Sequence, residues 1–224
     1  MRQLNEKTMQ QQHFSFRELT AYLEERLRKP LPGRASHTLM APQNRVFIDS
    51  QEAQILHPRE SSVLFLLFPE NDHVSTVLIK RAKDGSAHSG QLAFPGGKKD
   101  PADKDNRDTA LREALEETNI RCEEVRILGS LSDLYIPPSN FIVHPFIGIS
   151  EKRPELVPDP KEVSLIYTPD ISWFFDPGKR KIKDIQMFHG NLLKTPYFDI
   201  YEETLWGATA MIISEFIDVV NERH

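Results

Sequence analysis

The strongest constraint on this chain is a cluster of carboxylates that a helix would gather on one face. Residues 108–118 favour a helix, in which Asp108 or Thr109 can cap the first turn and Asn119 can take the left-handed terminating position. At about 100° per residue, Glu113, Glu116 and Glu117 fall within an arc of about 100° on it. Carboxylates this close repel one another, and a bound divalent cation removes that repulsion. The segment therefore predicts a helix whose acidic face completes a cation site.

Carboxylate oxygens are hard ligands that suit Mg²⁺ or Mn²⁺, and such ions neutralise a diphosphate and lower the pKa of a bound water. Arg112 stays charged at any working pH and can hold a carboxylate by a two-point contact, so we expect it to fix one of the glutamates. The plainer interpretation is a solvated acidic surface, which isolated acidic runs usually are. The double glycine at Gly96-Gly97, upstream of the helix, favours the cation site.

Length and composition describe an ordinary globular chain. Its 224 residues suit one domain with a modest extension, and we place an N-terminal helix and irregular lead-in at 1–57 and the main domain at 58–224. A formal net charge of -5 argues against broad nucleic-acid binding, which needs basic surface. We find no apolar run long enough to cross a membrane and only one cysteine, so we expect a cytoplasmic protein in a reducing compartment.

The pattern along the chain predicts an α+β fold, a mixed sheet sandwiched between helices. Leu19, Leu23 and Leu27 recur at helical spacing and predict a helix that ends at about Arg28. Their shared face is either a packing face or a homodimer contact. Two apolar segments, at 62–68 and 74–80, flank a turn at 69–72 and predict a hairpin. Residues 30–60 are expected to be irregular. Further strands are expected at 125–131, 141–149 and 163–167, near Met187 and at 192–200, and a closing helix at 205–220.

The acidic segment resembles the Nudix box, a glycine followed by spaced acidic residues and the core Arg-Glu-apolar-X-Glu-Glu. Gly97 matches the opening glycine, and the core matches Arg112-Glu113-Ala114 and Glu116-Glu117. The chain departs from the box in three ways: Asp103 replaces the first glutamate, eight residues rather than seven precede Arg112, and Asn119 replaces a glycine. The resemblance implies the Nudix fold in residues 58–224 and a diphosphate hydrolase. The implied metal site comprises Gly97, Asp103, Glu113, Glu116 and Glu117.

The flanking sequence resembles one Nudix branch, the coenzyme A diphosphatases. That branch also has the extra residue and the aspartate, and its signature is similar to residues 88–100 here, while 139–148 and 206–210 resemble further segments of it. The resemblance implies hydrolysis of coenzyme A to adenosine 3′,5′-bisphosphate and 4′-phosphopantetheine. Ser86 stands where the branch has an arginine, which keeps two alternatives open: a hydrolase of ADP-ribose or a related compound, and a non-catalytic nucleotide sensor.

The remaining site candidates lie around this motif. We expect Arg81, His88, Gly96, Gly97 and Lys98 to contact a small nucleotide substrate. Each has a plainer interpretation: a surface ion pair for Arg81, a loop histidine for His88, and a tight backbone path for the glycines. The catalytic set is expected to include Arg112, with Glu116, Glu117 or the remote Glu162 as general base.

Overall fold

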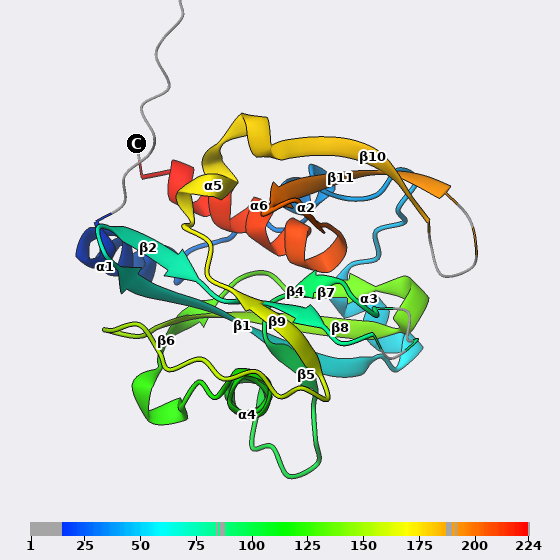
Figure 1. Cartoon of the computed structure of the whole chain (residues 1–224). Coiled ribbons are helices and arrows are strands. Elements are labelled where there is room, and N and C mark those ends of the chain that lie inside the picture. Colours follow the sequence, from blue (N-terminus) through cyan, green and yellow to red (C-terminus); the bar gives the residue numbers. More distant parts are fainter. Residues whose placement is uncertain (1–14, 84, 86–87, 187–189, 191, 224) are drawn as a thin grey trace, which may run out of the picture.

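A six-stranded mixed sheet forms the centre of the molecule in the computed structural model, which describes residues 15–83, 85, 88–186, 190 and 192–223 (Figure 1). Its order is β2-β1-β8-β6, with β5 also paired to β1 and β7 also paired to β8. The central pair β1 and β8 is parallel, and the other pairs in this sheet are antiparallel. Two three-stranded sheets accompany it, in the orders β4-β3-β9 and β10-β11-β12.

The strands are β1 (Arg59–Glu70), β2 (His73–Thr76), β3 (Leu78–Arg81), β4 (Leu92–Ala93), β5 (Gly96–Lys98), β6 (Arg126–Ser130), β7 (Leu134–Ile136), β8 (Phe141–Ile149), β9 (Val163–Tyr167), β10 (Arg180–Gln186), β11 (Leu192–Ile200) and β12 (Glu203–Leu205). The α-helices are α1 (Phe16–Arg26), α2 (Arg34–Thr38), α3 (Ser50–Ala53), α4 (Asn106–Thr118), α5 (Ser172–Phe175) and α6 (Gly207–Asn221). Short 3-10 turns are η1 (Gln54–Leu56), η2 (Cys122–Glu124), η3 (Pro137–Ser139) and η4 (Pro177–Lys179).

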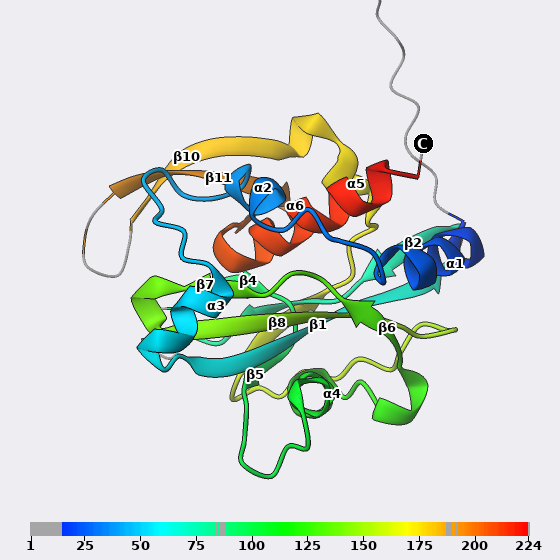
Figure 2. The same cartoon turned by 180° about the vertical axis from the view of Figure 1, so that it is seen from behind.

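Helices cover both faces of the main sheet, which confirms the expected α+β sandwich. Figures 1 and 2 show α4 on one face, α6 on the other, and the ribbon of β10 and β11 beyond α6. The alternation of side chains along β1 explains the layers, because successive residues of a strand point to opposite faces. Leu64 and Leu66 pack in one core with Ala110 of α4, while Phe65 packs in the other with Phe216 of α6.

The expected hairpin is confirmed, but its second segment is split between two sheets. β1 and β2 pair antiparallel, with Glu70 opposite His73. β2 then ends at Thr76, and β3 starts at Leu78 and pairs instead with β9 and β4. Val77, between them, is fully buried in the core beneath α4. The run of apolar residues therefore predicts that residues on both sides of Val77 are buried. It does not predict that the chain passes from one sheet to another at this residue.

The acidic helix begins earlier than expected. Asp105 caps it by accepting a 2.8 Å hydrogen bond from the backbone N–H of Asp108, so the cap is neither Asp108 nor Thr109. The end is confirmed: Asn119 adopts φ 62° in the left-handed region, where its N–H donates to the carbonyl of Leu115 at 2.9 Å. The helix α4 thus spans Asn106–Thr118.

The N-terminal segment packs closely against α6. Leu19 and Leu23 are fully buried in the main core, as the packing-face interpretation predicts. The expectation of an irregular 30–60 segment is wrong in part, since α2 and α3 lie there. The expected strand near Met187 lies outside the described residues, whereas β10, just before it, was not expected. No helix in the described part of the chain is both long and apolar enough to span a membrane.

Candidate active site

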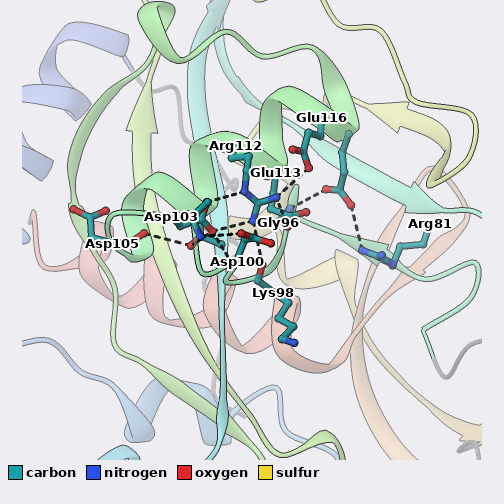
Figure 3. Close-up of polar contacts among 12 residues, drawn as sticks. Arg81, Gly96, Lys98, Asp100, Asp103, Asp105, Arg112, Glu113 and Glu116 are labelled. Atoms are coloured by element: carbon teal, nitrogen blue, oxygen red, sulfur yellow. Dashed lines mark hydrogen bonds and ion pairs between the residues drawn. The ribbon is translucent and has the colours of Figure 1, made fainter.

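The acidic face of α4 lies against β5 and the end of β3, and a single arginine is the centre of its contacts. Arg112 holds Asp103 with two hydrogen bonds, from Nε to Oδ1 at 2.8 Å and from Nη2 to Oδ2 at 3.0 Å (Figure 3). Its Nη1 donates to Glu113 Oε1 at 2.8 Å and to Glu116 Oε2 at 3.0 Å. A further bond reaches the carbonyl of Lys98 at 3.1 Å. Arg112 thus joins the helix, the preceding loop and β5.

Asp103 is surrounded by donors from the protein itself. Besides Arg112, its Oδ2 accepts hydrogen bonds from Thr109 Oγ1 and from the backbone N–H of Asp100, both at 2.8 Å. The bonds from Arg112, with those from Asp100 and Thr109, hold the pKa of this carboxyl well below its usual range. Both oxygens of Asp103 therefore have partners, and its geometry is that of an anchor for Arg112.

Gly97 provides the space that the carboxylate of Glu113 fills. A Cβ added at Gly97 would stand 2.7 Å from Glu113 Oε1, closer than real Cβ atoms approach a neighbour. Burial raises the pKa of Glu113, while the Arg112 guanidinium opposes that rise. The opening glycine of the motif is thus needed here for the close approach of a side chain.

Glu117 is the most deeply buried carboxylate of the cluster, with a residue exposure of 1%. Its Oε2 accepts a 2.8 Å hydrogen bond from the backbone N–H of Gly96, and its Oε1 lies 3.3 Å from Nη1 of Arg81. Its pKa is raised to about 7, chiefly by burial; the Gly96 N–H and the Arg81 charge oppose the rise, and the charges of Glu113 and Glu162 add to it. For so buried a carboxylate, Glu117 has few partners: one backbone N–H and one long contact with a positive charge.

Gly96 needs the freedom of a glycine for its own reason. Its φ of 155° lies in a region that side chains disfavour, and an added Cβ would stand 2.7 Å from the Cα of Val63 on the neighbouring strand β1. This close approach of β5 to β1 positions the Gly96 N–H, which donates its hydrogen bond to Glu117. The two glycines thus support two different glutamates.

The other expected site residues lie at the exposed edge of this cluster. The side chain of Glu116 is 57% exposed and is held on one side by Arg112. Glu162 is exposed just before β9, and its charge acts on Glu113 and Glu117, so it belongs to the same electrostatic cluster. Lys98 is exposed at the end of β5.

The loop after β3 is described only in part. His88 is exposed, and its Nδ1 lies 3.2 Å from Oε1 of Gln91, which agrees with a loop histidine that has a local partner. Ser86, the departure from the coenzyme A signature, lies outside the described residues. The structure therefore places His88 without testing its contact with a substrate.

The chemistry of these donors fits a hard divalent cation. Within the described residues, no three acidic, histidine or cysteine side chains converge closely enough to hold a metal ion as they stand. Arg112 and Arg81 contact carboxylate oxygens of Glu113, Glu116 and Glu117 that a cation would need. Burial raises the pKa values of Glu113 and Glu117, and repulsion from neighbouring carboxylates raises them further. A bound cation would relieve this repulsion. The residues thus fit such an ion after a rearrangement of side chains.

Several contacts were missed by the sequence reasoning. Thr109, treated as a helix cap, instead donates to Asp103, and Arg81 pairs with Glu117 rather than with a surface acid. Gly96 and Gly97 carried a usable signal, because adjacent glycines indicate that two chain segments approach closely. The Arg81 contact had no such signal, since it depends on how β3 lies beside α4.

Comparisons with known proteins agree with this geometry. The family described as the NUDIX domain matches residues 58–184. A protein of Photorhabdus laumondii named Uncharacterized Nudix hydrolase NudL is 33% identical over 144 residues, which cover 64% of this chain and 76% of that one. Nudix hydrolase 15, mitochondrial, of Arabidopsis thaliana is 30% identical over 181 residues, or 78% of this chain and 63% of the plant protein.

Solved structures show the same fold at low sequence identity. The Nudix hydrolase RenU from M. smegmatis matches with a TM-score of 0.52 and 14% identity, over 82% of this chain and 94% of RenU. A MutT/nudix family protein from Enterococcus faecalis matches with a TM-score of 0.51 and 18% identity, over 94% of this chain and 76% of that protein. At these identities the likeness concerns the fold alone.

Proposed function

The chain belongs to the NUDIX domain family and is a Nudix hydrolase, and from this premise we propose that it hydrolyses the diphosphate bond of coenzyme A or its derivatives. The products would be adenosine 3′,5′-bisphosphate and 4′-phosphopantetheine. The observation that carries a diphosphate substrate is the buried Glu117, short of positive partners beside Glu113 and Glu116. The segment 88–100, similar to the coenzyme A branch, supports the finer assignment.

The acidic face of α4 has the role of the cation site in this proposal. Glu113, Glu116 and Glu117 would hold Mg²⁺ or Mn²⁺, with the backbone of Gly97 at the edge of the site. The ion would neutralise the diphosphate and lower the pKa of a water bound to it. Of the three, Glu117 is held by the Gly96 N–H and Glu113 fits against Gly97, whereas Glu116 is the most exposed.

Arg112 and Asp103 would position these ligands. Arg112 is gripped at two points by Asp103, so the rest of its guanidinium is directed at Glu113 and Glu116. Asp103 was expected among the metal ligands. Since its oxygens already accept four hydrogen bonds, we assign it to holding Arg112.

Glu162 is our choice of general base. It is exposed, its charge acts on Glu113 and Glu117, and among the described residues no hydrogen bond ties its carboxylate to α4. Glu116, the helix alternative, already accepts a 3.0 Å hydrogen bond from Arg112, so one of its oxygens is occupied. Glu162→Gln should lower kcat more than KM, and Glu116→Gln should also weaken Mn²⁺ binding.

A substrate panel with Mg²⁺ and Mn²⁺, read by product identity, tests the function. We expect coenzyme A to yield adenosine 3′,5′-bisphosphate, with acyl derivatives also cleaved. Turnover of ADP-ribose without turnover of coenzyme A would overturn the substrate assignment in favour of the alternative that Ser86 keeps open. Binding without turnover of any compound would favour the nucleotide sensor. Ser86→Arg should tighten coenzyme A binding if that position contacts a phosphate.

A further inference from the structure

The two oxygens of Glu117 have partners of very different kinds. Oε2 is fixed at 2.8 Å by a backbone N–H of β5, which cannot leave without moving the strand. Oε1 faces Nη1 of Arg81 at 3.3 Å, a long contact with a flexible side chain. The side chain of Glu117 is 1% exposed and that of Arg81 is 32% exposed. One oxygen is therefore permanently anchored, and the other is held by a group that can leave.

The main chain at Arg81 is fixed while its guanidinium is not. Its backbone N–H donates to the carbonyl of Gln91 at 3.0 Å, and the register between β3 and β9 shifts between Lys80 and Arg81. This shift sits next to the loop that begins after β3. The arginine side chain is long enough to swing while its Cα stays in place. Lys80, one residue earlier, is tied instead to Glu203.

A divalent cation and the Arg81 guanidinium compete for the same oxygen. Both are positive, so a cation bound through Oε1 would repel a guanidinium that now stands 3.3 Å from that atom. The displaced guanidinium can bind another anion, and phosphate oxygens match its planar donors at two points. A diphosphate on the cation would offer such oxygens within the reach of the same side chain.

We propose that Arg81 exchanges partners, holding Glu117 while the cation is absent and moving to a phosphate of the substrate when the cation takes Glu117. Arg81 is then a positioning residue that links cation binding to binding of the anionic substrate. This inference rests on the proposed cation site. Because such coupling is reciprocal, substrate should tighten cation binding by the factor by which the cation tightens substrate binding.

The first test measures Mn²⁺ binding to the protein alone, from the free-ion signal in electron paramagnetic resonance. Arg81→Gln should bind Mn²⁺ about two- to five-fold more tightly than the wild type, since a competitor has gone. The matched control Lys80→Gln removes the same charge one residue away and should change the affinity little. If Arg81 instead only orients the Glu117 side chain, Arg81→Gln would bind Mn²⁺ more weakly than the wild type. That result would refute the exchange. Thermal unfolding checks that each variant is folded.

The second test measures coupling and separates exchange from a simple loss of charge. Mn²⁺ titrations are repeated with adenosine 5′-monophosphate, and a blank without protein corrects for Mn²⁺ bound by the nucleotide. The wild type should show coupling of about five-fold or more, Arg81→Lys should keep part of it, and Arg81→Gln should lose it. Equal coupling in Arg81→Gln and wild type would overturn the inference.

Both readouts are independent of turnover. If the substrate panel shows no hydrolysis while Mn²⁺ binding still responds to Arg81 as described, the exchange stands and the proposed substrate fails. If Glu117→Gln leaves Mn²⁺ binding unchanged, the cation site itself is wrong, and the inference fails with it.

Discussion

Two buried glutamates, Glu117 near the C-terminal end of α4 and Glu215 in the middle of α6, have very different hydrogen-bond partners. Glu215 of α6 is fully buried and accepts four hydrogen bonds: from Gly33 N at 2.9 Å, Ser132 Oγ at 2.6 Å, Ser132 N at 3.0 Å and His37 Nε2 at 3.0 Å. Glu117 of α4 is almost as buried but has one firm hydrogen bond and one long ion pair.

The pKa values record the difference. Burial acts to raise the pKa of Glu215, but the hydrogen bonds from His37 and Ser132 together bring it below its ordinary value. Burial raises the pKa of Glu117 to about 7, and its few partners do not compensate. A buried carboxylate whose partners are complete stabilises the fold, whereas one with incomplete partners marks a place where a ligand can complete the set.

The largest expected effect concerns activity at Glu117. Glu117→Gln removes the proposed cation ligand while keeping the shape of the side chain, so kcat should fall at least about a thousand-fold, equivalent to about 4 kcal/mol at the transition state. Steady-state kinetics with Mg²⁺ measures the loss, and circular dichroism verifies the fold. Activity within ten-fold of wild type would show that Glu117 holds no catalytic cation.

Glu215→Gln should have the opposite effect, a loss of stability without a loss of activity. An amide cannot satisfy the four donors around Glu215, so the free energy of unfolding should drop by about 3 kcal/mol, as when a buried polar network is broken. Urea unfolding at pH 7 measures the change. Activity per folded molecule should stay near wild type, and a stable but inactive variant would contradict the assignment of this cluster to stability.

The pH dependence of stability without cations should separate the two residues. Glu117 has a raised folded pKa, so its contribution is fully present below its unfolded pKa and is lost as the pH rises towards about 7, by on the order of 3 kcal/mol. Glu215 has a lowered folded pKa, so its contribution is present above its unfolded pKa and is lost as the pH falls through the folded pKa.

Urea unfolding in EDTA from about pH 3 to 9 tests both signs. Glu117→Gln should remove the loss of stability on the alkaline side, and Glu215→Gln should remove part of the loss on the acid side. Parallel curves for Glu117→Gln and wild type across this range would mean that Glu117 does not titrate in the folded state.

The smallest effects concern the glycines that support each carboxylate. At Gly97 an added methyl group meets the movable end of Glu113, so Gly97→Ala should cost little stability and lower activity by about ten-fold, or about 1.4 kcal/mol at the transition state. Gly33 has φ 54° and donates to Glu215, so Gly33→Ala should cost about 1 kcal/mol of stability and leave activity unchanged. Thermal unfolding and kinetics on both variants provide the comparison.

The features that could be predicted from the sequence depend on residues close together in the chain, and those that could not depend on residues far apart in it. The face shared by Glu113, Glu116 and Glu117 and the left-handed end at Asn119 depend only on the helix repeat and local backbone preference. Arg81 beside Glu117 joins residues 36 positions apart and depends on sheet packing, which periodicity does not encode. The partners of Glu215 lie up to 182 residues away, in the chain's first third and in the loop after β6, so no local pattern could predict them.

Strand β10 was missed for a related reason. Its residues are mostly exposed and mostly charged, so they show no alternation of apolar and polar side chains. The strand exists because it pairs along its whole length with β11, from Arg180 opposite Phe198 to Gln186 opposite Leu192. Backbone pairing with an apolar partner strand can thus form a strand from a segment whose own composition predicts none.

The position of α6 has a consequence for how the protein is made. Phe216 of α6 packs against Phe65 of β1, and Arg26 is bonded to Glu222 across 196 residues. During synthesis at about 5–20 residues per second, the inner face of β1 must therefore wait on the order of ten seconds or more for its covering helix. Over that interval the apolar side chains of β1 that α6 covers in the folded protein, such as Phe65, lack their native partner.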